Sequence, residues 1–177
     1  MNEVSESAHS RYTPGEYGID ADRSSICFQG RSLWGLMPVR GRFKEFAGTG
    51  RWRDDGSVAG QLDIDVASLS TGIAKRDRHL VSPDFFDAER YPVITFTVAD
   101  LRLLPSDNAA IEGNLQIKNV TEQVTLLAAL AAPNSLAIQF NCRTTLDRNT
   151  FNISANQLGM VSAHVVIDAH LRWTRCA

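Results

Sequence analysis

The sequence predicts an all-β protein of about eight antiparallel strands, in which a single barrel is favoured over a sandwich, with one short helix near residues 75–87. Three observations predict it. Apolar and polar residues alternate with a period of two along several long runs, so that each run has one dry and one wet face. Turn signals rich in Pro, Gly, Asn and Asp separate most of the runs. Strands this long favour a closed barrel, since an open sheet would expose their edges.

The alternating runs follow one another with little between them. In residues 164–174, Val165 and Ile167 share one face with Trp173, while His164 and Asp168 lie on the other. In residues 135–146, Leu136, Ile138, Phe140, Cys142 and Leu146 share a face in the same way. The expected strands cover residues 16–20, 24–30, 38–53, 57–68, 93–104, 110–120, 122–131, 135–146 and 164–174.

One stretch, residues 74–92 (AKRDRHLVSPDFFDAERYP), interrupts the alternation. Leu80 and Val81, together with Phe85 and Phe86, can form the apolar side of a short helix, which Pro83 ends or restarts. Because this segment connects two strands, we expect the helix to cap one end of the barrel.

The length and charge bound the protein class. At 177 residues with a net charge of −2, the chain suits one domain and argues against wholesale attraction to nucleic acid or an anionic membrane. No apolar run approaches the ~20 residues that a membrane-spanning helix needs. Residues 1–13 are polar, without the apolar region of a secretory signal, so we expect a flexible tail before a domain over residues 14–177, and a cytoplasmic location.

The cysteines and histidines give no metal signature. The three cysteines, Cys27, Cys142 and Cys176, form no CxxC-type cluster, and the first two lie in apolar strand-like runs. His164 and His170 share a strand face but would lie about 20 Å apart. We therefore expect neither a metal nor a cofactor.

Arg76, Asp77 and His79 are the residues most typical of an active site. In a catalytic interpretation Asp77 orients His79 for acid–base chemistry, but residues two apart do not face each other on a helix. In a structural interpretation Asp77 caps the helix, and the Arg and His side chains tie its exposed backbone to neighbouring strands. The sequence favours this clasp, while contact with a ligand and catalysis stay open.

Basic and aromatic residues are interleaved over residues 39–54 (VRGRFKEFAGTGRWRD), a pattern that can bind single-stranded nucleic acid. Arg40, Arg42 and Lys44, however, alternate with Val39 and Phe43 as the outer face of a strand would. A solvated outer face is therefore favoured, with no nucleic-acid partner.

Several motifs occur in an order typical of a known family. The most specific is Ser70-Thr71-Gly72 followed by Arg76-Asp77-His79-Leu80, Phe85-Phe86 and Tyr91-Pro92; Gly113-Asn114-Leu115 and Val120-Thr121 come later. Over residues 14–174 the chain resembles the YceI-like family of lipocalin-type barrels. The resemblance implies a single extended eight-stranded antiparallel β-barrel. Its long apolar channel would hold an isoprenoid lipid, such as a polyprenyl phosphate or a quinone, without catalysis. Many members of that family are periplasmic.

Three positions depart from the pattern of that family. Arg23 and Arg31 stand where the family commonly has His, and Asn152 stands where Gly commonly follows the Phe. We expect the barrel to tolerate these changes, whereas the treatment of a ligand head group can differ from that in relatives.

Inward-facing apolar residues either fill the barrel or line a ligand channel, and the resemblance favours a channel. An apolar loop over residues 30–38 (GRSLWGLMP) is the expected gate, and a homodimer is possible. The alternatives are an enzyme that uses the cavity with His79, Asp77 or Arg76, and a stress-related interaction protein. The candidate lining residues are Phe28, Trp34, Phe43, Leu62, Ile64, Phe96, Leu115, Ile117, Phe140, Val165 and Ile167.

Overall fold

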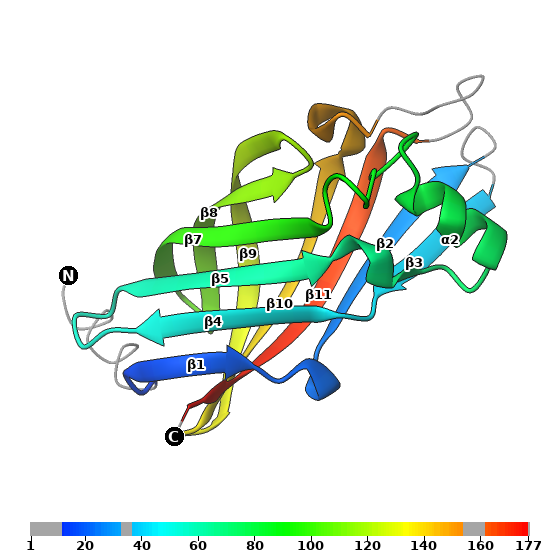
Figure 1. The fold of residues 1–177 in the computed structure, drawn as a ribbon. Helices are drawn as coiled ribbons and strands as arrows, with labels where there is room; N and C mark the ends of the chain where they lie inside the picture. The colour runs from blue at the N-terminus through cyan, green and yellow to red at the C-terminus, as the bar shows by residue number, and fades with distance from the viewer. Residues whose placement is uncertain (1–11, 33–36, 154–161, 177) are drawn as a thin grey trace.

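The computed structural model describes residues 12–32, 37–153 and 162–176, and it confirms an eight-stranded antiparallel β-barrel with one helix (Figure 1). Its helical elements are α2 (Ala74–Val81) and the 3-10 turns η1 (Ala21–Arg23), η2 (Val66–Ser68) and η3 (Arg148–Phe151). Its strands are β1 (Gly15–Ile19), β2 (Ser25–Ser32), β3 (Met37–Phe43), β4 (Phe46–Trp52), β5 (Val58–Asp65), β6 (Leu69–Ser70), β7 (Val93–Leu104), β8 (Asn108–Ile117), β9 (Val120–Asn134), β10 (Ala137–Asp147) and β11 (His164–Arg175).

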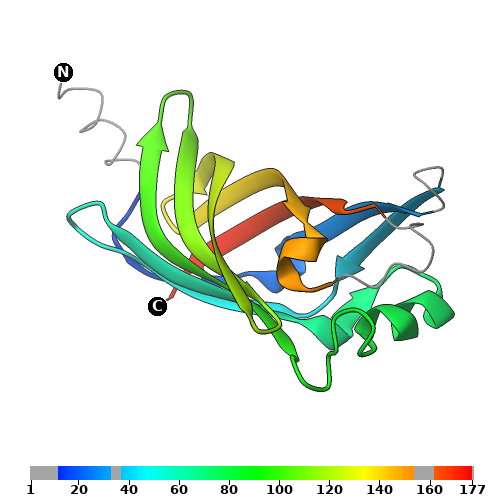
Figure 2. The ribbon, with the colours of Figure 1, turned by 90° about the horizontal axis from the view of Figure 1, so that it is seen from above.

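Eleven strand segments make eight barrel strands because two long strands are interrupted and the two-residue β6 lies outside the ring, paired with the end of β3. β1 and β2 are two parts of one strand separated by η1, and β3 and β4 are separated at residues 44–45, where the sequence predicted one strand over 38–53. β1 pairs with both β4 and β11, which closes a ring in the order β1-β4-β5-β7-β8-β9-β10-β11. β2 and β3 extend the sheet past this ring and lie beside α2 (Figures 1 and 2).

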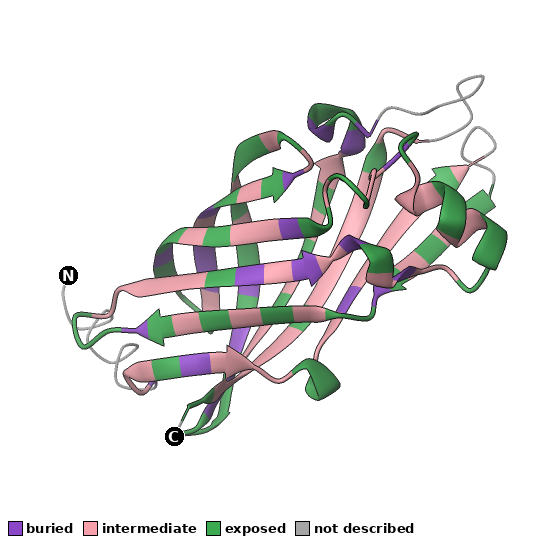
Figure 3. Cartoon of the chain, in the orientation of Figure 1, coloured by how far each residue is buried: buried purple, intermediate pink, exposed green. Residues whose placement is uncertain are grey.

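The predicted alternation decides which side chains face inward. In β5, Leu62 and Ile64 lie in the core, while Gln61 and Asp63 are outside and hydrogen-bond to each other at 2.8 Å. Thr95 on the neighbouring strand donates to Asp63 at 2.7 Å, so outward polar residues satisfy one another across strands. The bands of different burial along β4 in Figure 3 follow this period of two.

Two apolar clusters pack at opposite ends of the barrel. The cluster beside α2 centres on Val66, which is 1% exposed, and includes Phe43 and Phe85. In the cluster at the other end, Tyr12 stacks on Trp52 with ring centroids 4.8 Å apart. Tyr12 is 6% exposed, so the packed part of the chain includes a residue that the sequence analysis assigned to the tail. The remainder of the predicted division into tail and domain stays a prediction.

The predicted helix is present but shorter than expected. α2 ends at Val81, because Ser82 precedes Pro83 and is extended, with a ψ of 169°. Phe85 and Phe86 lie in the turn that follows, and the ring of Phe86 meets the ring of Phe43 edge to face at 6.3 Å. No helix in the described ranges is long and apolar enough to cross a bilayer.

The inward assignment of Leu136 was wrong. Leu136 lies in the turn between β9 and β10 and is 59% exposed. The strand β10 begins one residue later, at Ala137, and its register against β9 shifts between Ala137 and Gln139. The alternation of apolar residues does not show where a strand begins. Leu136 precedes the strand and was therefore assigned to the inward face by mistake.

Gly113 is a position where the barrel needs the absence of a side chain. A Cβ there would lie 2.5 Å from the Phe96 ring and 2.6 Å from the backbone oxygen of Thr97. The ring can turn toward the lumen, but the backbone oxygen is held by the strand. This explains why Gly precedes Asn114 and Leu115 in the motif of the sequence.

We predict that Gly113→Ala lowers the free energy of unfolding by about 1–3 kcal/mol, because the added methyl group overpacks the wall. Urea denaturation measures the change. Gly50→Ala is the matched control, because the nearest atom to a Cβ at Gly50 is 3.5 Å away. Equal free energies of unfolding for the two variants would show that the close contacts at Gly113 do not destabilise the fold.

Candidate functional site

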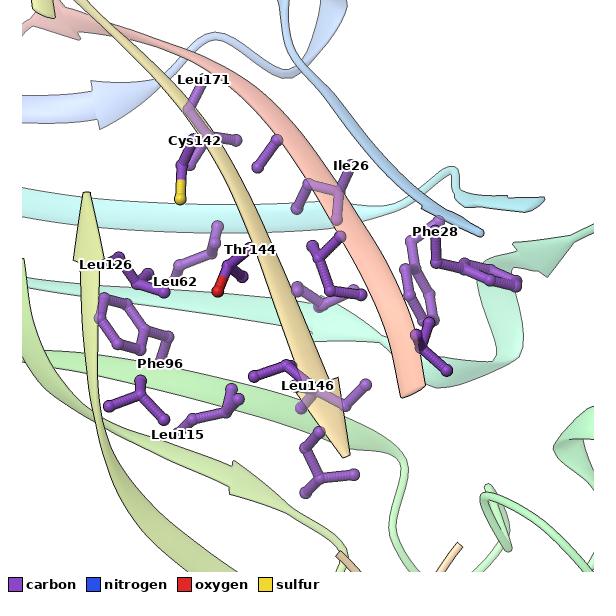
Figure 4. Close-up of a pocket in the computed structure, with 18 of the residues that line it drawn as sticks. Ile26, Phe28, Leu62, Phe96, Leu115, Leu126, Cys142, Thr144, Leu146 and Leu171 are labelled. Carbon is purple, nitrogen blue, oxygen red and sulfur yellow. The ribbon is translucent and has the colours of Figure 1, made fainter. Parts of the chain in front are cut away.

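The barrel encloses an elongated cavity of about 750 Å³, within the range typical of small-molecule sites. Its walls come from nearly every strand and are mostly aliphatic and aromatic. Figure 4 shows side chains of several strands directed into it, among them Ile26, Leu62, Leu115 and Leu171.

The lumen is hollow and not filled by its own side chains. Along β11, none of the residues from His164 to Arg175 is buried, although Val165, Ile167 and Leu171 point inward. In a filled barrel such residues would be covered by the opposite wall. Partial exposure of inward apolar residues therefore means that they face open space, which decides between the two interpretations that the sequence left open.

The predicted lining residues that lie in the described ranges all border this cavity. Trp34 lies outside the described residues, as do residues 33–36 of the expected gate over residues 30–38. That these residues contact a ligand stays a prediction. Those that border the cavity are Phe28, Phe43, Leu62, Ile64, Phe96, Leu115, Ile117, Phe140, Val165 and Ile167.

Sequence analysis missed part of the wall. Cys142 and Leu146 were placed on the inward face of their run, and Trp173 on that of β11, yet none was chosen as a lining residue. Val124 and Leu126 in β9 alternate with Gln123 and Thr125, a signal that the run of small residues after them obscured. The missed residues on the wall include Ile26, Val124, Leu126, Ile138, Cys142, Thr144, Leu146, Leu171 and Trp173.

Polar residues border the cavity mainly at the end beside α2, here called the polar mouth. It comprises Arg31, Arg76, His79, Asp84 and Arg148. Four of the five residues carry or can carry a positive charge, so this end of the lumen is the one suited to an anionic or hydrogen-bonding group. Arg31 is one of the three departures from the family pattern, and it stands in the mouth.

Arg148 is a buried cation with a structural role. It is 7% exposed, its Nε donates to the backbone oxygen of Ser162 at 2.8 Å, and its Nη1 donates to that of Ile153. Burial lowers the pKa of this guanidinium, and the charge of Asp147 acts in the opposite direction. Asn152, which ends η3, has a φ of 55°. Asn tolerates this left-handed conformation better than most residues, which explains how it replaces Gly here.

Arg23 is remote from the cavity. It lies in η1, its side chain is 70% exposed, and it pairs with Asp20 at 3.0 Å. The departure at this position therefore concerns the outer surface and not the cavity wall.

Arg76 and Asp77 hold Thr71, and these three residues are here called the clasp. The Thr71 amide donates to the Asp77 carboxylate at 2.8 Å, and the Thr71 hydroxyl donates to the same oxygen. Arg76 Nε donates to the Thr71 hydroxyl at 2.8 Å, and its Nη2 to the Thr71 carbonyl at 3.2 Å. Gly72, with a φ of 79°, provides the turn that brings α2 back onto Thr71.

The prediction that Asp77 caps α2 was wrong. The residue at the cap position is Ile73, whose side chain makes no capping bond, and Asp77 lies within the first turn. Its carboxylate reaches back past the helix start to Thr71. The spacing of Thr71, Arg76 and Asp77 in the sequence therefore reflects the bonds between the turn at Thr71 and the first turn of α2, and not a helix cap.

His79 does not pair with Asp77. Its Nε2 lies 3.4 Å from a carboxylate oxygen of Asp84, and its ring meets the ring of Phe85 edge to face at 5.0 Å. The side chains of His79 and Asp84 are 54% and 67% exposed. Among the described residues, His79 and Asp77 therefore do not form the pair that the catalytic interpretation required. His79 pairs with Asp84 at the polar mouth instead, where both side chains are exposed to solvent.

Cys142 faces the lumen, and burial raises the pKa of its thiol, with a smaller effect from Asp168 in the same direction. A thiol with a raised pKa is a poor nucleophile at neutral pH. Within the described residues, no three His, Cys, Asp or Glu side chains converge as metal ligands would.

Comparison with protein families gives one match that spans most of the chain. The model of the YceI-like domain matches residues 17–173. A UPF0312 protein of Pseudomonas putida is 30% identical over 146 residues, which cover 78% of this chain and 76% of that protein. Protein YceI of Escherichia coli O157:H7 is 36% identical over 119 residues, 65% of this chain and 61% of that protein.

Solved structures share the same barrel. BcnA of Burkholderia cenocepacia aligns with a TM-score of 0.78 at 26% identity, covering 87% of this chain and 98% of BcnA. A polyisoprenoid binding domain from Saccharophagus degradans, implicated in plant cell wall breakdown, aligns with a TM-score of 0.75 at 19% identity, covering 90% of this chain and 98% of that domain.

We predict that Asp77→Asn destabilises the fold by about 1–2 kcal/mol at pH 7, because the hydrogen bonds to a charged acceptor are weakened. Burial raises the pKa of Asp77, but the bonds from Thr71 and the charges of Arg76 and Lys44 outweigh it and hold the pKa below its usual range. The stabilisation is therefore present above the unfolded pKa of about 4 and is lost as the pH falls through the folded value.

Urea denaturation of the Asp77→Asn variant and the natural protein between pH 7 and pH 3 measures this difference, which should shrink with acidification. Asp22→Asn, on the exposed turn η1, is the control and should leave stability unchanged at every pH. A deficit for Asp77→Asn that stays constant with pH would contradict the role of its charge.

Proposed function

Because the chain belongs to the YceI-like family, we propose that it binds the chain of an amphiphilic isoprenoid lipid inside its barrel and does so without catalysis. A binding and carrying role follows, since the lipid would be shielded from water while it is held. The class includes polyprenyl phosphates and isoprenoid quinones.

The observation that carries this proposal is the hollow, apolar lumen with its partly exposed inward face. Apolar surface removed from water contributes about 25 cal/mol per Å², so burying ~300 Å² of a lipid chain is worth roughly 7 kcal/mol before the costs of association. No charged partner is needed along the length of the chain. The lumen therefore suits a long hydrocarbon better than a compact polar substrate.

The polarity of the cavity gives the lipid a direction. Because Arg31, His79 and Arg148 border one end, we place the head group at the polar mouth and the tail toward the cluster around Trp52. A phosphate would gain charge-assisted hydrogen bonds there, and a quinone would gain neutral ones. The neighbour from Saccharophagus degradans, a polyisoprenoid binding domain, has the same fold and supports this class of ligand.

The arrangement of the titratable groups supports binding over catalysis. Arg76 and Asp77 are engaged with Thr71, and the pair of His79 and Asp84 is more than half exposed. Solvent screens such a pair and weakens its action on a bound substrate. Native mass spectrometry of the protein purified from its own host tests the proposal directly: a co-purifying isoprenoid is expected. Protein that carries no lipid and binds neither a prenyl phosphate nor a quinone would overturn it.

We predict that Ala169→Phe lowers the affinity for a short-chain ubiquinone by at least about tenfold, because a phenyl ring at the middle of β11 occupies the lumen. Ala169 borders the cavity and pairs with Cys142 and Ile26 on its two neighbouring strands. Quenching of tryptophan fluorescence measures binding, since Trp52 and Trp173 border the same cavity.

The stability of the Ala169→Phe variant provides a second readout. In a filled core the change would cost about 1–3 kcal/mol, whereas in a hollow lumen it should cost less. Asn114→Phe, on the exposed outer face of β8, is the control and should bind normally. Unchanged affinity of a folded Ala169→Phe protein would place the lipid elsewhere.

We predict that Arg31→Glu weakens binding of geranylgeranyl phosphate by about tenfold while leaving geranylgeraniol unchanged, because a charge is reversed at the polar mouth. Isothermal titration calorimetry of both ligands with the natural protein and the Arg31→Glu variant separates the contribution of the head group to the affinity from that of the tail. Arg23→Glu on η1, away from the cavity, is the control. An equal loss for phosphate and alcohol would show that Arg31 acts through structure and not through charge.

A further inference from the structure

β9 and β10 are neighbours in the barrel but pair along only part of their length. Their ladder runs from Ala137 opposite Asn134 to Cys142 opposite Ala128. Beyond it, residues 120–127 of β9 pair with β8, and residues 143–147 of β10 pair with β11. Within the described part of the chain, no strand pairing joins these two segments to each other.

A local irregularity lies at the other end of this ladder, where β9 advances three residues against two of β10. The register of β10 against β9 shifts between Ala137 and Gln139, near the turn that connects the two strands. Such a bulge bends its strand and increases the local twist. The two strands pair over a few residues, and beyond Cys142 and Ala128 no ladder joins their described residues.

Side chains on the two separated segments point into the lumen. Leu126 on β9 and Thr144 and Leu146 on β10 border the cavity, and Figure 4 shows them directed into it from the two facing strands. The outward residues Thr125 and Thr145 are exposed. The unpaired stretch between residues 120–127 and residues 143–147, here called the window, therefore has exposed threonines on its outer side and cavity-lining side chains on its inner side.

Lys118 closes the far side of the window. It lies in the turn between β8 and β9 with a φ of 56°, and its Nζ donates to the backbone oxygen of Phe85 at 3.0 Å and to that of Asn152 at 3.1 Å. These two bonds join the tip of the β8–β9 hairpin to η3 and to the turn after α2. The window is thus bounded by two strands, by the last pair of Cys142 with Ala128, and by Lys118.

Among the described residues, other routes into the lumen meet packed side chains or paired strands. The end beside α2 is packed with Phe43, Phe85 and Phe86, and the opposite end with the stacked pair of Tyr12 and Trp52. Entry elsewhere through the wall would break paired strands, at a net cost of about 1 kcal/mol for each hydrogen bond. At the window, within the described residues, that ladder is absent. The bonds of Lys118 and the packing of Phe151 and Ile153 against Ile117 and Val120 are what must be released there.

Resting on the proposed function, we propose that an isoprenoid chain enters and leaves the lumen sideways through the window, and that Lys118 is the latch that sets the rate of exchange. The window ends at η3, beside the polar mouth. A lipid can therefore place its head group at the mouth while its tail passes broadside between β9 and β10. The chain does not have to thread tip first past the aromatic cluster.

A covalent staple across the window tests this route. Continuing the register of Cys142 with Ala128 places Thr145 opposite Thr125. Thr125→Cys and Thr145→Cys are combined with replacement of the three natural cysteines by Ala, and the pair is joined with bis-maleimides of increasing length. Stopped-flow quenching by a short-chain ubiquinone then gives the association and dissociation rates. We expect the shortest staple to slow both by at least about tenfold while Kd changes little, since a gate alters the barrier and not the bound state.

The control staple joins Asn114→Cys to Gln123→Cys, an exposed pair opposite each other on the paired strands β8 and β9. It should leave both rates unchanged. Unchanged rates in the protein stapled across the window would overturn lateral entry and favour entry through the mouth. Failure of the unstapled protein to bind any isoprenoid would instead overturn the proposed function.

Removal of the latch should have the opposite effect. Lys118→Met keeps the length of the side chain and removes both hydrogen bonds, so we expect association and dissociation to accelerate together by about threefold or more at nearly constant Kd. Lys118→Arg, which can still donate, should restore slower exchange. A lower melting temperature with unchanged rates for Lys118→Met would show a purely structural role and would overturn its assignment as the latch.

Discussion

Side chains that line a hollow lumen lack protein neighbours on one side, and the rest of the structure depends on how their missing packing is replaced. In most domains of this size a central core supplies much of the stability. Here the buried apolar residues are divided between two clusters, one around Val66 beside α2 and one around Tyr12 and Trp52 at the far end. The wall between them is held by antiparallel ladders, whose hydrogen bonds need no filled interior. The fold therefore stabilises its ends and leaves its middle open.

The interrupted strands follow from the same constraint. β1 pairs with both β4 and β11 and closes the ring, whereas β2 and β3 continue past it toward α2. Because of the breaks at η1 and at residues 44–45, β1 and β4 belong to the closed ring, while their continuations β2 and β3 belong to the extended part. At the extended end the clasp on Thr71 and the buried Arg148 take over the role of strand pairing. Polar groups are therefore concentrated where the ladders end, which is also where a lipid head group would be placed.

The sequence predicted the barrel and the faces of its strands well, because a period of two is a local property of each run. Leu62 with Ile64 on β5 and Val165 with Ile167 on β11 needed no knowledge of the partner strands. Whether the interior was filled depended on the distance between opposite walls, and no single run contains that information. The capping role of Asp77 was wrong because the bond that it makes, to Thr71, belongs to a turn outside the helix. The separation of β9 from β10 and the bonds of Lys118 were not foreseen, since they depend on register.

An open lumen with a latched wall ties stability to occupancy. A ligand that binds the folded state alone stabilises it by RT ln(1 + [L]/Kd), about 2.7 kcal/mol when its free concentration is a hundred times Kd. A bound hydrocarbon would supply the contacts that Phe96, Leu115 and Phe140 lack across the cavity. The window admits it without breaking a ladder, so the unpaired part of the wall can open while the cluster around Tyr12 and Trp52 stays packed. Ligand exchange therefore depends on the window, whereas the stability of the fold depends mainly on the two end clusters.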